Sequence, residues 1–482
     1  SSLLDNRSLD LHNTRMKKNR CLLLLHCCVI LILVVALIFP STGDATHDTD
    51  NCKSEFCGDA FAPGDTRDFI YAIGDLHGDV DCAQHWVKLT GLVQNTTLEK
   101  ESWTWSGSSG SEVIFMGDYI DKGPLSLPTV EFVKALTEEF PLNMKALMGN
   151  HEMELLKDRD PRRQASGAYF HLPYAIVHPA EFLNFLSDAP TQQDHIAIDA
   201  LLNASLEVYG NGMYSTVTFT PYGRNSIVNF VDPPDLRPAV AEKLEAYQKS
   251  YLDAFRSGTE LGSWLEKLPI SIMGDEGTIF VHGGVSPFVA AKHLSRGETD
   301  VNRLNKQLAS NTEEARLLNF LEGTRVGQAI TELAFYRGNH EEEGHGGQKE
   351  KPGKSDGSRS MSPTCKEVKR IVKMMKGVNR IAVGHTPDSN VRITCDGMLM
   401  ALDSALGRWF RANGNMYCQG TAERLSRNGK FKCNQIKQGC EGQIVRIAKQ
   451  DGRVEIIDSS GKIFGTDDPS SSHFAAAFLQ EL

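Results

Sequence analysis

Five short apolar runs along the chain each end in glycine or histidine and a polar loop. They lie in FIYAIGDLHGD (69–79), EVIFMGDYIDKG (112–123), NMKALMGNHE (143–152), TIFVHGG (278–284) and RIAVGHT (380–386). An apolar run that stops abruptly at such residues is typical of a buried strand followed by a loop. Because ligands of open α/β sheets bind beyond the carboxyl ends of the strands, we expect these five loops to line one metal site.

Helical periodicity follows the first two runs, over 80–92 and 127–140. Strands that alternate with helices favour parallel pairing in βαβ units, so the predicted fold class is α/β. Two later segments, 397–403 and 443–458, are predicted to add strands. Within the second of them, Asp451-Gly452 is predicted to turn a hairpin.

Composition divides the chain into parts. The stretch 153–270 is largely helical in pattern and predicts an α-helical insertion in the main domain. Residues 340–363 are poor in apolar side chains and rich in Gly and charge, which is typical of a disordered surface loop with solvent-facing His340 and His345. The predicted parts are a targeting segment 1–43, a polar tether 44–67, a catalytic domain 68–460 and a C-terminal tail 461–482.

An apolar run near the N-terminus, residues 21–39, follows a basic segment and precedes acidic residues. This charge asymmetry predicts that the rest of the chain leaves the cytosol. The run is long enough to span a bilayer, yet Ser41-Thr42-Gly43 offers a small-residue cleavage site. A cleaved signal peptide and an uncleaved membrane anchor both stay open. The expected location is the secretory pathway: the endoplasmic reticulum lumen, the outside of the cell, or a membrane with the catalytic domain on its lumenal side.

Cysteine usage agrees with this location, and the net charge bears on the choice of partner. Of 11 cysteines, those outside the apolar run are even in number, which permits disulfides in an oxidising compartment. Local pairs Cys52–Cys57 and Cys433–Cys440 are candidates, although spacing does not determine connectivity. Asn95 and Asn203 begin N-glycosylation sequons. The formal net charge of −10 disfavours a nucleic-acid partner held through its phosphates.

The polar residues beyond the five runs form a plausible set of metal ligands. Carboxylate, amide and imidazole donors without a thiolate suit Mn, Fe or Zn better than an all-oxygen Ca or Mg cage. Two such ions, about 3.5–4 Å apart, clamp a phosphoryl group and activate water. The candidate ligands are Asp75, His77, Asp118, Asn150, His282 and His385.

Next to these ligands lie candidates for catalysis. His151 adjoins Asn150 and is the predicted general acid, with Asp121 orienting its ring. Lys122 is predicted to contact phosphate oxygens. Four other histidines lack such a context and are predicted to be surface or packing residues: His85, His171, His178 and His195.

In this order, GDLHGD, GDYIDKG, GNHE, VHGG and GHT resemble the signature of the calcineurin-like metallophosphoesterase superfamily, in its phosphoprotein phosphatase form. The segments 254–270, 281–287 and 334–340 are most similar to the Shewanella-like (bacterial-like) protein phosphatases. The resemblance implies a β-sandwich flanked by helices around a βαβαβ core. It also implies that phosphate monoesters are hydrolysed by direct attack of a hydroxide that bridges two metals.

By the same resemblance, the ligands divide between two divalent ions. Asp75, His77 and Asp118 would hold the first ion. The second would be held by Asp118, Asn150, His282 and His385, and Arg337 would be a second phosphate contact. Lys122 stands where many relatives have Arg, and a lysine binds phosphate as a point charge rather than as a bidentate fork.

Two substrate classes remain open. A phosphorylated protein is the leading expectation, and the alternative is a small molecule such as a dinucleoside polyphosphate or nucleotide, as for phosphoesterases of the ApaH type. A non-enzymatic scaffold would require lost ligands, whereas all six are present. Oligomeric state is left open by the sequence.

Overall fold

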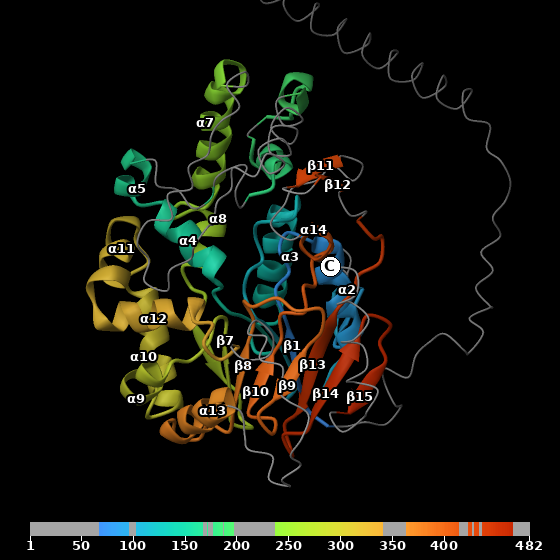
Figure 1. Cartoon of the computed structure of the whole chain (residues 1–482), viewed down its shortest axis with the longest axis vertical. Helices are drawn as coiled ribbons and strands as arrows, with labels where there is room; N and C mark the ends of the chain where they lie inside the picture. Colours follow the sequence, from blue (N-terminus) through green and yellow to red (C-terminus); the bar gives the residue numbers. More distant parts are fainter. Residues whose placement is uncertain are drawn as a thin grey trace, which may run out of the picture. The chain divides into compact units, whose positions relative to one another are not determined.

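Two β-sheets form the centre of the structure, a computed structural model (Figure 1). It describes residues 67–95, 103–166, 171, 177–186, 188–196, 237–340, 363–413, 423–426, 429–432 and 436–465. These all fall within the unit Gly58–Leu482. The predicted targeting segment, Asn203, most of the loop 340–363 and the tail beyond 465 therefore lie outside the described residues.

The first sheet has six strands in the order β15-β14-β13-β1-β4-β5. Its strands are β1 (Phe69–Ile73), β4 (Glu112–Phe115), β5 (Met144–Ala146), β13 (Gln443–Ala448), β14 (Val454–Asp458) and β15 (Ile463–Gly465). Strands β1, β4 and β5 run parallel, as the alternation of strands and helices predicted, and β13 adds antiparallel to β1. The predicted hairpin at Asp451-Gly452 joins β13 to β14.

The second sheet has five strands in the order β6-β7-β8-β10-β9. They are β6 (Ser271–Met273), β7 (Thr278–Val281), β8 (Arg380–Val383), β9 (Arg392–Thr394) and β10 (Leu399–Ala401). Strands β7, β8 and β10 run parallel to one another. The carboxyl ends of β7 and β8 therefore lie at the same edge of this sheet.

The two sheets pack face to face through one layer of apolar side chains. Ile70 of β1 and Ile114 of β4 share a buried cluster with Phe280 of β7 and Ala382 of β8. The alternate residues of β1, such as Tyr71, join a second cluster with the helices instead. Since successive strand residues point to opposite faces, a fully apolar strand supplies both layers. The predicted α/β sandwich flanked by helices is confirmed.

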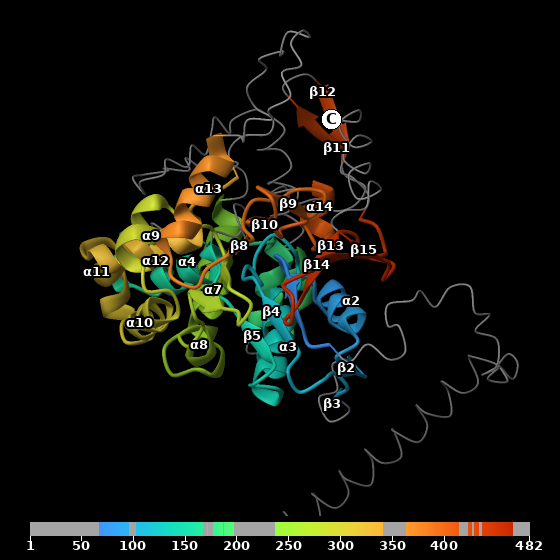
Figure 2. The same cartoon turned by 90° about the horizontal axis from the view of Figure 1, so that it is seen from below.

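Helices cover the outer faces of this sandwich (Figures 1 and 2). Beside the first sheet lie α2 (Val80–Thr90) and α3 (Ser126–Glu139). On the side of the second sheet lie α9 (Pro287–His293), α10 (Glu298–Ala309), α11 (Glu314–Gly323), α12 (Arg325–Phe335) and α13 (Pro363–Met374). A short helix, α14 (Arg408–Asn413), follows β10. Two small hairpins complete the described elements: β2 (Val93–Gln94) with β3 (Thr104–Trp105), and β11 (Glu423–Ser426) with β12 (Gly429–Lys432).

The predicted insertion is helical where the structure describes it. Its elements are α4 (Asn150–Asp158), α5 (Pro161–Ser166), the 3₁₀ helix η2 (Pro179–Phe185), α7 (Arg237–Ala254) and α8 (Glu260–Leu265). Tyr251 of α7 packs against Phe182 and Phe185 of η2 and against Phe255, with ring centroids 4.8–5.6 Å apart. This aromatic cluster joins η2 to α7. Among the described residues, no helix combines the length and the apolar composition that a bilayer span requires.

Two disulfides link segments that are distant in the sequence. Cys82 of α2 pairs with Cys440, which lies 358 residues away, and Cys365 of α13 pairs with Cys395. The local pair Cys433–Cys440 is therefore wrong. Because β13 pairs with β1, the residues before β13 pass beside α2, and it is this tertiary contact that selects the partner of Cys440. Cys52 and Cys57 lie outside the described residues.

Candidate metal centre and acid pair

The six predicted ligands lie directly beyond strands of the two sheets. Asp75 and His77 follow β1, Asp118 follows β4, and Asn150 begins α4 after β5. From the second sheet, His282 follows β7 and His385 follows β8. All six side chains are buried. The packing of the two sheets thus brings together residues from positions 75 to 385.

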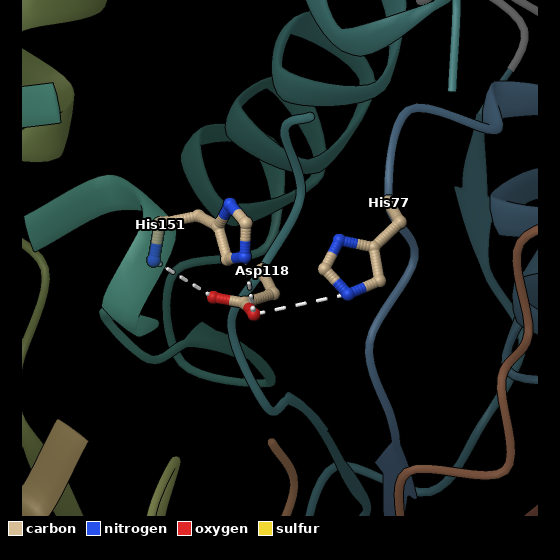
Figure 3. Close-up of side chains that lie close together, drawn as sticks. All are labelled: His77, Asp118 and His151. Carbon is tan, nitrogen blue, oxygen red and sulfur yellow. Dashed lines mark hydrogen bonds and ion pairs between the residues drawn. The ribbon is translucent and has the colours of Figure 1, made fainter. Parts of the chain in front are cut away.

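One group of donors lies around His77 (Figure 3). Its Nε2 is 3.8 Å from Oδ2 of Asp118 and 3.9 Å from Oδ2 of Asp75. Its Nδ1 lies 3.2 Å from the carbonyl oxygen of Ile120. Because a carbonyl oxygen only accepts hydrogen bonds, Nδ1 is the donor in this contact. A carbonyl at Nδ1 fixes the tautomer in which Nε2 carries a lone pair, as metal-binding histidines require.

A second group of donors lies around His282. Its Nε2 is 3.2 Å from Oδ1 of Asp118 and 2.9 Å from Oδ1 of Asn150, while the ring centroid of His385 is 5.1 Å away. Here the carbonyl of Met116, 2.8 Å from Nδ1, again directs Nε2 toward the carboxylate. The two oxygens of Asp118 therefore face different imidazoles. This arrangement suits a carboxylate that bridges two ions.

Left-handed backbone conformations bring these side chains inward. His77, Asp118 and His385 have φ of 44°, 55° and 67°. Such values are costly for residues other than glycine and persist where the surroundings enforce them. The His77 amide donates to the carbonyl of Asp118 at 2.9 Å, and this hydrogen bond joins the loop after β1 to the loop after β4. A Cβ on Gly149 would lie 2.3 Å from the amide nitrogen of Asp118, so this close approach requires glycine.

The electrostatics of the cluster favour bound cations. Burial, followed by repulsion from Asp403 and Asp118, raises the pKa of Asp75 well above its usual range. Burial also lowers the pKa of His77 and of His385, which keeps these imidazoles neutral and able to ligate. Buried carboxylates that repel one another are stabilised by a local positive charge. The oxygen and nitrogen donors, their lone pairs and these charges fit a pair of divalent cations.

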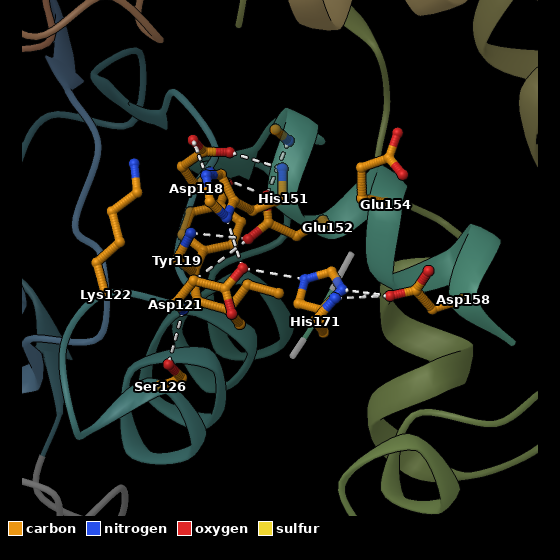
Figure 4. Close-up of polar contacts among 12 residues, drawn as sticks. Asp118, Tyr119, Asp121, Lys122, Ser126, His151, Glu152, Glu154, Asp158 and His171 are labelled. Carbon is orange, nitrogen blue, oxygen red and sulfur yellow. Dashed lines mark hydrogen bonds and ion pairs between the residues drawn. The ribbon is translucent and has the colours of Figure 1, made fainter. Parts of the chain in front are cut away.

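His151 and Asp121 form a buried pair next to this cluster (Figure 4). Nδ1 of His151 is 2.5 Å from Oδ2 of Asp121, and Nε2 of His151 is 3.7 Å from Oδ2 of Asp118. Burial alone would raise the pKa of Asp121, but His171 and His151 outweigh it and lower that pKa below its usual range. Asp121 is thus an ionised hydrogen-bond acceptor for Nδ1 of His151. The other ring nitrogen of His151, Nε2, faces the cluster of candidate metal ligands.

His171 differs from its prediction as a surface or packing residue. It is fully buried, with Nε2 3.0 Å from Oδ2 of Asp121 and Nδ1 2.9 Å from Oδ2 of Asp158. No pattern around His171 in the sequence points to this place, since it lies in the insertion, far from the five loops. The other three histidines agree with their prediction: His195 is exposed, His85 is half-buried, and His178 caps the start of η2.

The two predicted phosphate contacts line the same cluster. Nζ of Lys122 lies 3.3 Å from Nε2 of His77 and 4.2 Å from the ring centroid of Phe410. Nη1 of Arg337 donates to Oγ1 of Thr386, one residue after His385, at 3.2 Å. Burial lowers the pKa of both cations. Each is thus a partly dehydrated positive group at the edge of the donor cluster.

Three further residues of the site received no role from the sequence. Glu152 accepts hydrogen bonds from the backbone after β4, and Asp403 is a buried carboxylate whose pKa is raised by burial. His340 is partly buried rather than solvent-facing as predicted, and burial lowers its pKa to about 4. After α12 the chain returns to the loop after β7, where Oδ1 of Asn339 accepts the backbone amide of Val285. This contact determines the position of the next residue, His340. His345 lies outside the described residues.

Comparisons with known proteins agree with this geometry. Residues 70–236 match the family described as calcineurin-like phosphoesterase. The chain is 34% identical over 79 residues to the serine/threonine-protein phosphatase 6 catalytic subunit of Caenorhabditis elegans, covering 16% of this chain and 19% of that protein. It is 31% identical over 87 residues to Shewanella-like protein phosphatase 2 of Arabidopsis thaliana, covering 17% and 20%. It is 34% identical over 86 residues to a symmetrical bis(5'-nucleosyl)-tetraphosphatase of Legionella pneumophila, covering 18% and 25%.

These alignments span about a fifth to a quarter of the relatives' own length. Among solved structures, a cold-active protein-tyrosine phosphatase of a psychrophilic Shewanella species is 16% identical, with 83% of this chain and 80% of that chain covered and a TM-score of 0.45. The family match includes the loops after β1, β4 and β5, which carry four of the six candidate ligands. Residues 70–236 thus match the calcineurin-like phosphoesterase family in the part of the chain that holds these loops.

Proposed function

We propose that the protein is a phosphoprotein phosphatase that uses two divalent metal ions. The observation that carries the proposal is the buried His151–Asp121 pair, in which Nε2 of His151 faces the metal-binding cluster. Alkoxide from phosphoserine or phosphothreonine is a poor leaving group and needs a proton as it departs. A histidine positioned by a carboxylate meets that need.

The proposed ligands divide as the two groups of donors do. Asp75, His77 and Asp118 would hold one ion, and Asp118, Asn150, His282 and His385 the other. Mn, Fe or Zn suits this donor set. When bound, the two ions supply a nucleophile from water at neutral pH and offset the charge of the phosphoryl group.

The remaining proposed roles belong to side chains around the cluster. His151 donates a proton to the leaving oxygen from Nε2, and Asp121 holds its Nδ1–H. Lys122 and Arg337 bind the non-bridging phosphate oxygens, since both are cations at the edge of the donor cluster, Lys122 half-buried and Arg337 exposed. Charge-assisted hydrogen bonds from such groups orient the phosphate for in-line attack.

A location in the secretory pathway is part of the proposal. The two disulfides support an oxidising compartment, because such bonds are rare in the cytosol. The partner is a phosphorylated protein of that compartment rather than a nucleic acid, and residues 21–39 would supply any membrane attachment.

The proposal is tested with metal-stripped protein to which Mn, Fe or Zn is restored. Turnover is measured on peptides carrying phosphoserine, phosphothreonine or phosphotyrosine and on a diadenosine polyphosphate. We expect metal-dependent release of phosphate from at least one phosphopeptide, and loss of that activity in Asp118→Asn. Absence of turnover on every phosphopeptide would overturn the protein phosphatase proposal.

The same experiment tests the alternative, a dinucleoside polyphosphate hydrolase. Its support is the similarity to a symmetrical tetraphosphatase, which is as high over 86 residues as that to protein phosphatases. Faster cleavage of the diadenosine substrate than of any phosphopeptide would favour this alternative. Both substrates use the same metal-binding cluster, so Asp118→Asn abolishes either activity.

A further inference from the structure

A chain of four side chains in contact, two histidines and two aspartates, leads from His151 into the insertion (Figure 4). Oδ2 of Asp121 lies between His151 Nδ1, at 2.5 Å, and His171 Nε2, at 3.0 Å. Nδ1 of His171 then meets Oδ2 of Asp158 at 2.9 Å. All four side chains are buried, so neither solvent nor salt screens these contacts effectively.

Asp158, the far end of this chain, is itself held firmly. Its Oδ2 also accepts the backbone amide of His171 at 2.9 Å, and its Oδ1 accepts Nη1 of Arg163 at 2.8 Å. Arg163 in turn donates to Glu154. The position of the His171 ring is thus determined by both its backbone and its side chain.

His171 carries a positive charge in this setting. Burial alone would lower its pKa, but Asp121 and Asp158 outweigh burial and raise that pKa to about 10. Asp121, His151 and His171 could otherwise be interpreted as a metal site, since one donor atom of each lies within 4.8 Å of the others. An imidazole with a carboxylate at each nitrogen holds two protons and has no lone pair for a metal, so the geometry favours a proton on both nitrogens.

We propose that His171 is a positioning residue for the reaction, acting on His151 through Asp121. Its imidazolium holds the Asp121 carboxylate in the orientation that receives the Nδ1–H of His151, which directs Nε2 of His151 to the leaving oxygen. This inference rests on the proposed function of the same site. It adds a residue from the helical insertion to the machinery for leaving-group protonation.

Leaving groups of different basicity provide the test. His171→Gln keeps a hydrogen-bond donor and removes the charge, and Asp158→Asn weakens the same chain from its far end. The substrates are a phosphoserine peptide, glycerol 2-phosphate and p-nitrophenyl phosphate. The two alkyl esters need a proton on the leaving oxygen, whereas nitrophenolate departs without one.

We expect both variants to lose about 10-fold in kcat on the alkyl esters, with KM unchanged and less than about 2-fold loss on p-nitrophenyl phosphate. The matched control is His178→Gln, a buried histidine of the same insertion outside this chain of charges, which should retain both rates. Metal content and thermal unfolding are measured on every variant, and the wild-type metal content should persist in His171→Gln and Asp158→Asn.

Two results would overturn the inference. Equal loss on all three substrates, together with lost metal, would mean that His171 serves only folding. Unchanged rates on the alkyl esters in both variants would mean that Asp121 needs no support from His171. If the wild-type protein hydrolysed glycerol 2-phosphate but no phosphopeptide, the proposed function would fail, while the comparison of leaving groups would still decide the role of His171.

Discussion

Glu152 of α4 accepts the backbone amide of Asp118 through Oε2 at 2.9 Å. Its other oxygen, Oε1, accepts the amide of Tyr119 at 2.8 Å, and Oε2 also accepts the amide of Gly149. The carboxylate that ends GNHE thus fixes the left-handed turn that follows β4. The motifs GDYIDKG and GNHE are thus joined by hydrogen bonds in addition to contributing candidate ligands to the same site.

Glu152→Gln is predicted to loosen this turn. The amide group would place an N–H donor against a backbone N–H, leaving both buried without an acceptor, which costs about 1–3 kcal/mol. We expect the free energy of unfolding to fall by that amount and metal retention after dialysis to fall with it. Denaturant unfolding and metal analysis measure both effects. Unchanged values for both would contradict the role assigned to Glu152.

Chelation is predicted to destabilise the protein as well as to inactivate it. Removal of the cations leaves Asp75, Asp118 and Asp403 buried near one another, and burial followed by their repulsion raises the pKa of Asp75. A ligand present at 100 times its Kd stabilises the folded state by about 2.7 kcal/mol. Tm should therefore fall on chelation and recover with Mn. In Asp118→Asn the shift should be smaller, and a wild-type Tm insensitive to metal would contradict the metal site.

Lys122→Ala is predicted to weaken phosphate binding. The Nζ group lies between His77 and the ring of Phe410, at the edge of the donor cluster. Loss of one charge-assisted contact costs about 1.5–3 kcal/mol, so the inhibition constant of inorganic phosphate should rise about 10-fold or more. Lys122→Arg should retain tight inhibition. Equal inhibition of Lys122→Ala and the wild type would exclude this contact.

Loss of the Cys82–Cys440 disulfide is predicted to lower the free energy of unfolding by about 2–4 kcal/mol. The bond closes a loop of 358 residues, against 30 for Cys365–Cys395, and longer loops restrict the unfolded chain more. The double variants Cys82→Ala/Cys440→Ala and Cys365→Ala/Cys395→Ala are compared by denaturant unfolding without reductant. A larger loss from the shorter loop would contradict the ranking.

The stability contributed by His171 is predicted to depend on pH. Burial alone would lower the pKa of His171, but the contacts with Asp121 and Asp158 outweigh burial and raise that pKa from 6.5 to about 10. The contribution is therefore fully present below pH 6.5 and is lost as the pH rises through about 10. The difference in Tm between the wild type and His171→Gln should shrink between pH 6.5 and 10. A difference that grows over this range would show that the histidine is neutral in the folded protein.

Much of the fold followed from local pattern. The runs that became β1, β4, β5, β7 and β8 are short, apolar and ended by Gly or His, and these features act over a few residues. The convergence of the polar residues just beyond these runs was predicted from one rule, that the carboxyl ends of parallel strands lie at the same edge of a sheet. Helices α2 and α3 were likewise visible as periodicity within one segment.

Residues that depend on long-range contact were not predictable in this way. Cys440 could pair with several cysteines, and only the pairing of β13 with β1 brought Cys82 beside it. His171 has no motif around it, and its function depends on two carboxylates contributed by other segments. His340 belongs to the same class, since its burial depends on the return of the chain after α12 to the loop after β7.

The sequence by itself determined the strands that precede the candidate ligands and the donor types beyond these strands, because each is encoded by neighbouring residues. Only the tertiary structure decided which atom each nitrogen of these histidines faces, how Asp121, His171 and Asp158 contact one another, and which cysteines join. These properties arise from distances between residues far apart in the chain. Burial then sets their energies, since charges interact strongly only where water is excluded.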